Sequence, residues 1–164
     1  MPNTFHEYFI SRSALPVHNV EYEKGCLNFH GVPLIPLVKK YGTPLRMYYL
    51  PNISQKIRDA RVMFKEAMKK LNYNREYNYC YCIKSCHLYD VVSKAMKENA
   101  HLETSSAYEV ELIIQLAKRQ ELNPDIQIIH NGYKTQEYLL KIIELKDLID
   151  NLSLIHISEP TRPY

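Results

Sequence analysis

Several features that define whole classes of protein are scarce in this chain of 164 residues. The chain has four glycines, and no Gly-x-Gly-x-x-Gly motif follows the first expected strand, so the usual sign of a dinucleotide-binding fold is missing. No apolar run approaches the ~20 residues that span a bilayer, and no signal peptide precedes the first polar residues. We therefore expect a cytoplasmic protein with no membrane partner.

The chain also has no large excess of positive or negative charge. The net charge is +3, and the lysines are spread along the expected helices instead of gathering in one block. This balance is too weak to indicate a nucleic-acid partner. With 46% hydrophobic and 24% charged residues and no low-complexity stretch, the composition is that of an ordinary globular protein.

The four cysteines allow two interpretations. The spacing of Cys80, Cys82 and Cys86 could indicate a metal site, with His87 adjacent. However, Cys80 and Cys82 would lie on the same face of a strand, whereas zinc sites favour Cys-x-x-Cys turns. We expect buried, reduced thiols, including Cys26, and no bound metal.

Hydrophobic periodicity predicts strands and helices that alternate along the chain. Helices are expected at 32–41, 52–71, 88–96, 106–119 and 135–145, and strands at 26–29, 45–50, 77–83, 101–104 and 126–130. From residue 45 onward, strand and helix alternate four times, which predicts an α/β fold with parallel strands. An open doubly wound sheet and a barrel both fit. The missing glycine motif favours the first half of a (β/α)8 TIM barrel, about four βα units.

Lys84 is the residue on which the functional prediction rests. It follows an aromatic and apolar run at 77–83 that is typical of a buried strand, so it lies at the strand's carboxyl end. In parallel α/β folds that end carries the functional sites, and a partly desolvated lysine there can lose its proton and attack a carbonyl. A surface lysine at a strand exit is the alternative.

Four segments resemble, in the right order, a known family of enzymes. Residues 81–84, Tyr-Cys-Ile-Lys, resemble the Tyr-Ala-Val-Lys strand of the alanine-racemase-like, fold type III, pyridoxal-phosphate (PLP) enzymes. Residues 39–45 resemble the segment before the first barrel strand of the amino-acid decarboxylases, and residues 101–110 resemble the family's third strand and turn. Residues 128–134, which contain Asn-Gly-Tyr-Lys, are closest to biosynthetic arginine decarboxylase.

The resemblance implies PLP-dependent decarboxylation of a basic amino acid, most simply arginine to agmatine in polyamine biosynthesis. Lys84 would hold the cofactor as a Schiff base, Glu103 would stand at the family's acidic position near the cofactor, and Asn131 would shape the active-site mouth. Glu103 could equally be an ordinary strand-end carboxylate, and Asn131 an ordinary Asn-Gly turn residue. Glu109 completes a capping-box motif with Ser106, which favours a structural role.

Other functions remain open at this point. Diaminopimelate and carboxynorspermidine decarboxylases would share the Lys84 strand, and a catalytically inactive regulatory homologue or a non-functional fragment is also possible. Ser85 and Cys86 stand where the family has Ala and Asn. The family's phosphate loop, ring-stacking residue and partner-subunit cysteine would lie beyond this sequence, in an intact parent that we expect to be a homodimer.

The last residues have a separate explanation. Residues 152–162 match the translation of a common sequencing adapter, so residues 152–164 are expected to be a non-native tail on a truncated gene and to pack against nothing specific. The expected organisation is therefore an irregular or strand segment at 1–31, which would pair with a missing C-terminal β domain, and a partial PLP-binding barrel at 32–151. Such a fragment would aggregate through its open strand edges and bind cofactor poorly.

Overall fold

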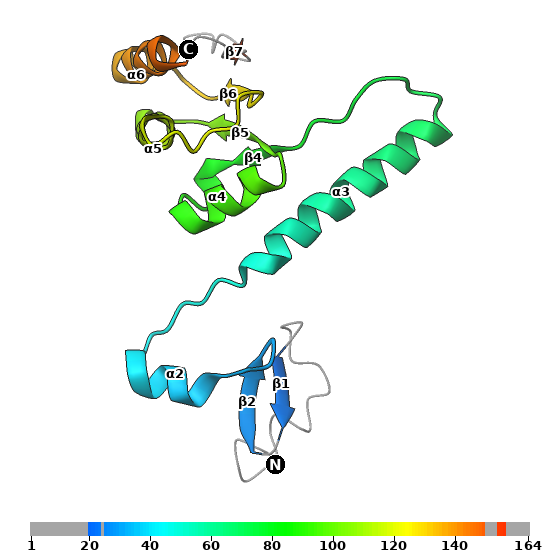
Figure 1. Cartoon of the computed structure of the whole chain (residues 1–164), viewed down its shortest axis with the longest axis vertical. Helices are drawn as coiled ribbons and strands as arrows, with labels where there is room; N and C mark the ends of the chain where they lie inside the picture. The colour runs from blue at the N-terminus through cyan, green and yellow to red at the C-terminus, as the bar shows by residue number, and fades with distance from the viewer. Residues whose placement is uncertain (1–19, 24, 150–153, 157–164) are drawn as a thin grey trace, which may run out of the picture. The chain divides into compact units, whose positions relative to one another are not determined.

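A computed structural model describes residues 20–23, 25–149 and 154–156, and it divides the chain into two compact units. The first unit comprises the described residues up to 48 and the second those from 49 onward. Each contains at least one helix and a small sheet, so the protein is a mixed α/β structure (Figure 1). Most of the segment expected to be irregular, residues 1–19, lies outside the described residues.

The first unit is a small antiparallel sheet followed by one helix. Its strands are β1 (Val20–Glu23), β2 (Cys26–Phe29) and β3 (Val32–Pro33), and its helix is α2 (Leu34–Tyr41). His30 and Gly31, with φ of 49° and 76°, connect β2 to β3, and positive φ at both positions suits a tight hairpin turn. The predicted strand at 26–29 and the predicted helix are confirmed, whereas β1 had no prediction of its own.

The strand predicted at 45–50 is wrong. Residues 45–49 have no regular secondary structure, and helix α3 (Leu50–Lys70) already begins at Leu50. Pro51 lies in the first turn of that helix, where its fixed φ and its missing N–H are both favourable. A strand also requires a neighbour, and β4 (Cys80–Cys82) pairs with β5 (His101–Thr104) and with no other described strand.

The second unit contains a parallel sheet in the order β4-β5-β6-β7, where β6 is Ile128–His130 and β7 is Leu154–His156. Three strand-to-helix units are present among the described residues. They join β4 to α4 (Tyr89–Lys97), β5 to α5 (Ala107–Lys118) and β6 to α6 (Gln136–Leu148). The strands and helices predicted from residue 77 onward are therefore confirmed in type, although β4 starts at Cys80 and β6 at Ile128.

The tail contributes one finding that differs from the expectation. Residues 154–156 form β7, which pairs in parallel with β6, so the prediction that residues 152–164 pack against nothing specific is wrong for these three residues. Backbone pairing does not depend on the origin of a sequence, so the adapter origin of the tail stays a prediction.

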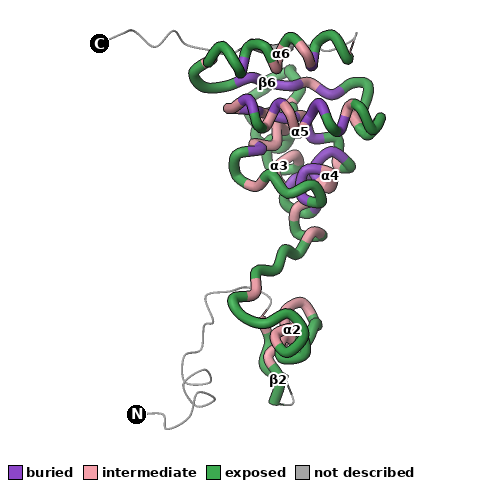
Figure 2. The backbone as a smooth tube through the Cα atoms, turned by 90° about the vertical axis from the view of Figure 1, so that its left-hand side faces the viewer, coloured by how far each residue is buried: buried purple, intermediate pink, exposed green. Residues whose placement is uncertain are grey.

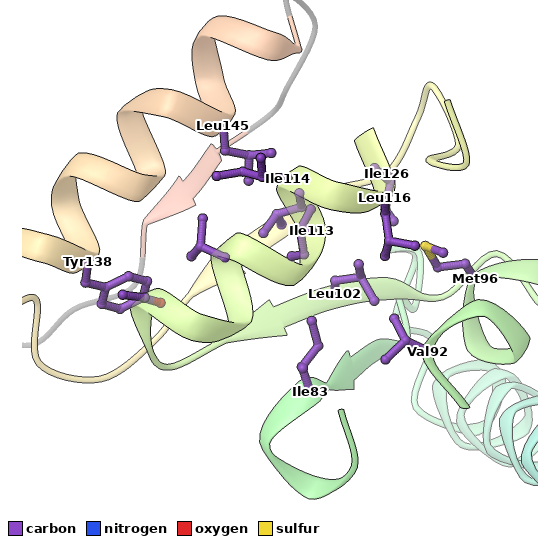
Figure 3. Packing of buried hydrophobic residues seen from close by; sticks show 13 residues of the cluster. Ile83, Val92, Met96, Leu102, Ile113, Ile114, Leu116, Ile126, Tyr138 and Leu145 are labelled. Atoms are coloured by element: carbon purple, nitrogen blue, oxygen red, sulfur yellow. The ribbon is translucent and has the colours of Figure 1, made fainter. Parts of the chain in front are cut away.

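The core of the second unit lies between the sheet and its helices (Figures 2 and 3). Leu102 of β5 and Ile128 of β6 are fully buried and belong to the same cluster as Ile113 and Ile114 of α5. Alternate residues of β5 and β6 are buried, which leaves Glu103 and Ile129 on the opposite face of the sheet. The helices therefore cover one face, and the other face is available for a site.

Helix α3 packs through its first half only. Its buried residues are Ser54 and Ile57, and Ile57 belongs to a second small cluster with Ala95 and Ala100. The apolar face expected to continue along the helix does not become buried, because Phe64 is 50% and Leu71 is 78% exposed. Although α3 has 21 residues, no helix in the described part of the chain combines the length and the hydropathy that crossing a membrane requires.

A buried polar cluster ties the ends of β5 and β6 to α6. Thr104 Oγ1 lies 2.7 Å from His130 Nδ1 and 2.8 Å from the Tyr138 hydroxyl, which also donates to the Thr104 carbonyl oxygen at 2.9 Å. Burial raises the pKa of Tyr138 to about 12, which the hydrogen bond to Thr104 only partly offsets. The phenol is therefore a neutral donor at physiological pH.

This cluster predicts that Tyr138→Phe lowers the free energy of unfolding by about 1–2 kcal/mol, because buried groups of Thr104 lose a hydrogen-bond partner. Tyr133→Phe is the matched control, since Tyr133 is 75% exposed and its loss of a hydroxyl leaves no buried group unsatisfied. Urea unfolding of both variants checks the prediction. Equal effects of the two substitutions would contradict it.

Candidate functional site

Lys84 lies in a short 3₁₀ turn, η1 (Ile83–Ser85), directly after β4. Ile83 is fully buried and anchors the turn, and the Ser85 hydroxyl donates to the Cys82 carbonyl oxygen at 2.7 Å. The Tyr81 hydroxyl donates to the Cys86 carbonyl oxygen at 3.0 Å, which fixes the other side of the same turn. Lys84 is thus held at the carboxyl end of the strand, as predicted.

The side chain of Lys84 is more accessible than the sequence suggested. It is 55% exposed, and the desolvation expected of the ammonium group in the intact parent protein stays a prediction. The turn around Lys84 is held by hydrogen bonds, whereas more than half of the Lys84 side chain is exposed.

Glu103 is the centre of the site. It stands opposite Cys82 in the parallel register of β4 and β5, and its side chain is 14% exposed. Its Oε1 accepts a hydrogen bond from Asn131 Nδ2 at 2.9 Å and lies 3.7 Å from Lys84 Nζ. Its Oε2 is hydrogen-bonded to Cys82 Sγ. The structure therefore brings the three predicted site residues together around one carboxylate.

Asn131 both closes a turn and contacts Glu103. Its backbone N–H donates to the Thr104 carbonyl oxygen at 2.7 Å, which seats it at the end of β6. Its Oδ1 accepts the Gly132 N–H at 2.7 Å, so it closes an Asn-Gly turn in which Gly132 has φ of +75°. Because Oδ1 is used in the turn, Nδ2 is the group left to bind Glu103.

The electrostatics of the site follow from these contacts. Burial alone would raise the pKa of Glu103, but hydrogen bonds from Cys82 and Asn131 and the nearby Lys84 ammonium outweigh burial and lower that pKa. Burial and the neighbouring carboxylate raise the pKa of Cys82. The stable arrangement is an ionised Glu103 that accepts from a protonated thiol.

Cys82 is the site residue that sequence reasoning missed. It was expected to be a buried, inert thiol, yet Cys80, Cys82 and Cys86 are only partly buried and Cys26 is exposed. The available signal was its position two residues before Lys84 on a strand that pairs with the Glu103 strand. Among the described residues, no three His, Cys, Asp or Glu side chains converge as metal ligands.

Glu109 acts at the start of α5, as its motif predicts. Ser106 Oγ accepts the Glu109 N–H at 3.4 Å, and Glu109 Oε2 accepts the N–H of Ser105 at 2.6 Å. The return bond of the capping box is therefore shifted by one residue, from Ser106 to Ser105.

Comparison with known proteins adds no assignment to this geometry. No protein-family model matches the chain, and no curated protein matches it.

The lowered pKa of Glu103 predicts a pH-dependent contribution to stability. Since the folded-state pKa lies below the ordinary value of about 4.3, this contribution is fully present above that pH and is lost as pH falls through the folded-state value. Glu103→Gln should thus be less stable than the wild type at neutral pH, and the difference should shrink on acidification.

Chemical unfolding measured between neutral and strongly acidic pH checks this expectation. Glu66→Gln is the control, because Glu66 is exposed on α3 and takes part in no ion pair among the described residues. A difference between Glu103→Gln and the wild type that stays constant with pH would show that the carboxylate is not selectively stabilised in its charged form.

Proposed function

We propose that the second unit, from residue 49 onward, forms the lysine-bearing part of a (β/α)8 barrel in a PLP-dependent amino-acid decarboxylase of the alanine-racemase-like family. The single observation that carries the proposal is the convergence of Lys84, Glu103 and Asn131 at the carboxyl ends of three adjacent parallel strands. Each of the three was selected from a different motif, and they are up to 47 residues apart, since 131 − 84 = 47.

The chemistry of these groups fits the aldehyde end of the cofactor. Lys84 supplies an accessible primary amine, and Glu103 and Asn131 supply a fixed carboxylate and a fixed carboxamide beside it. Lys84 would hold PLP covalently, and Glu103 would orient it. When bound, PLP supplies the electron sink that makes loss of CO2 from an amino acid possible.

The long contact between Lys84 and Glu103 supports this role. At 3.7 Å between Nζ and Oε1, with the lysine half exposed, the pair is a weak electrostatic contact that leaves the amine free to move. Glu103 itself is held by Cys82 and Asn131 and stays in place when the lysine departs. A cofactor lysine needs this combination, because its amine must approach and leave the reacting carbon.

The substrate is proposed to be a basic amino acid, with arginine favoured by the Asn-Gly-Tyr-Lys segment at 131–134. Lys134 is the rival amine in this region. Its Nζ donates to the Gly132 carbonyl oxygen at 2.8 Å and lies 5.4 Å from the centre of the Tyr138 ring. Burial lowers the pKa of Lys134, so a labelling experiment must distinguish it from Lys84.

In the intact parent protein, incubation with PLP followed by borohydride reduction should fix the cofactor on the peptide that contains Lys84. Lys84→Arg should lose this label, because a guanidinium stays protonated and cannot react with the aldehyde. Lys134→Arg and Lys94→Arg are the matched controls and should keep it. Peptide mass spectrometry measures the site, and preferential labelling of Lys134 or Lys94 would refute the assignment.

In the intact parent protein, Lys84→Ala should nearly abolish CO2 release from arginine, because both cofactor attachment and product release need the amine. Product analysis distinguishes agmatine from the products of diaminopimelate or carboxynorspermidine decarboxylation. Retention of most of the activity in Lys84→Ala would remove the decarboxylase assignment. Labelling at Lys84 without CO2 release from any of these substrates would instead favour the regulatory homologue.

A further inference from the structure

A second site lies at the other end of β4, where the chain returns from α3. The loop after Lys70 runs back along the last turns of α3 before it enters β4 at Cys80 (Figure 1). The ring of Tyr77 in this loop stacks on Phe64 of the helix, with ring centroids 4.1 Å apart and planes inclined by 6°. Helix and loop enclose an open cavity of about 640 Å³, a volume within the usual range for small-molecule sites.

The lining of this cavity is strongly basic. Arg61, Lys65, Lys69 and Arg75 contribute four positive charges, and Glu76 contributes the one negative charge of the lining. Arg61 is fixed in place, because its guanidinium donates to the carbonyl oxygens of Glu98 at 2.6 Å and Asn99 at 2.9 Å. The other three cations form no ion pair within the part of the chain that the structure describes.

The spacing of these cations on the helix is unfavourable without a ligand. Arg61, Lys65 and Lys69 follow one another at intervals of four residues, so they form a single row on α3. Like charges at this spacing repel each other, whereas Lys69 in the last turn of α3 also interacts favourably with the helix dipole. A bound anion would offset the repulsion between the three cations.

The lining of the cavity also contains apolar and aromatic side chains. Met68, Tyr73 and Tyr77 line it, and they also border an adjoining hollow lined by Phe64, Ala67 and Leu71. Tyr73 is 58% exposed, so its ring is available for stacking. A ligand that fills both parts needs an anionic group at one end and a flat or apolar body at the other.

We propose that this cavity binds a small anion with an aromatic body, of the class of nucleoside phosphates. The cations would bind the phosphate through charge-assisted hydrogen bonds, and the tyrosine rings would stack on the base. Because the cavity precedes β4 whereas Lys84 follows it, ligand binding here is separate from the chemistry proposed for Lys84. A phosphate-bearing metabolite bound at this position would stabilise the loop that leads into the lysine strand.

Adenosine 5′-monophosphate (AMP) is the test ligand, because it lacks an aldehyde and cannot react with Lys84. Equilibrium dialysis with the full chain should show saturable AMP binding. The double variant Lys65→Glu with Lys69→Glu should weaken it by at least about tenfold, since charge-assisted contacts to the phosphate become repulsive. Lys56→Glu with Lys70→Glu is the matched control, because both lysines are exposed on α3 outside the cavity lining.

Two further measurements separate the parts of the proposal. Tyr73→Ala should weaken AMP binding and leave the binding of inorganic phosphate unchanged, and circular dichroism verifies that each variant keeps α3. Absence of saturable AMP binding to the wild type would overturn the proposal. So would equal losses in the two charge-reversal pairs, or inorganic phosphate binding as tightly as AMP, because either result would reduce the site to unspecific charge attraction.

Discussion

The parallel register between β4, β5 and β6 is the constraint on which the site depends. Cys82 stands opposite Glu103 and Glu103 opposite Ile129, so the carboxyl ends of the three strands are level and the residues that follow them meet. A shift of one residue would exchange the two faces of β5 and move Glu103 into the helix-covered core. The same shift would move Leu102 and Thr104 out of the buried face of β5. Leu102 would lose its apolar contacts and Thr104 would lose its hydrogen bonds, so both residues oppose the shift. The same alternation that builds the core therefore places the carboxylate beside the lysine.

The site combines one fixed group with one movable group. Glu103 is bound by Cys82 and Asn131 and carries a lowered pKa, while Lys84 is anchored through its backbone and through buried Ile83. The Cys82 thiol helps to hold the Glu103 carboxylate in place. It stands where the PLP enzymes that residues 81–84 resemble have Ala, and it donates to the carboxylate oxygen that Asn131 does not use. A protonated Cys82 thus strengthens the charged form of Glu103, which in turn keeps a negative charge close to the lysine.

Much of the second unit could be predicted from sequence, because its strands and helices carry strong local signals. His101–Thr104 and the Ser106 cap of α5 are examples, whereas the three candidate site residues came from motifs that resemble a known family. The failures have a common physical origin in tertiary contacts. Residues 45–49 have the composition of a strand but no strand to pair with, and Phe64 has the spacing of a core residue but no element packed over it. The role of Cys82 depends on which strand lies beside β4, which a pattern within one strand does not specify.

The pairing of β7 with β6 depends on backbone hydrogen bonds at the edge of the parallel sheet. Ile128 and Ile129 of β6 present backbone groups in register with Leu154 and Ile155, so the pairing rests on main-chain hydrogen bonds. Edge pairing is therefore governed by the free hydrogen-bonding groups of β6, whereas the Lys84 site is governed by side chains that lie on β4, β5 and the turn after β6. The contacts of Glu103 with Cys82, Lys84 and Asn131 belong to β4, to the turn that follows it and to the turn after β6.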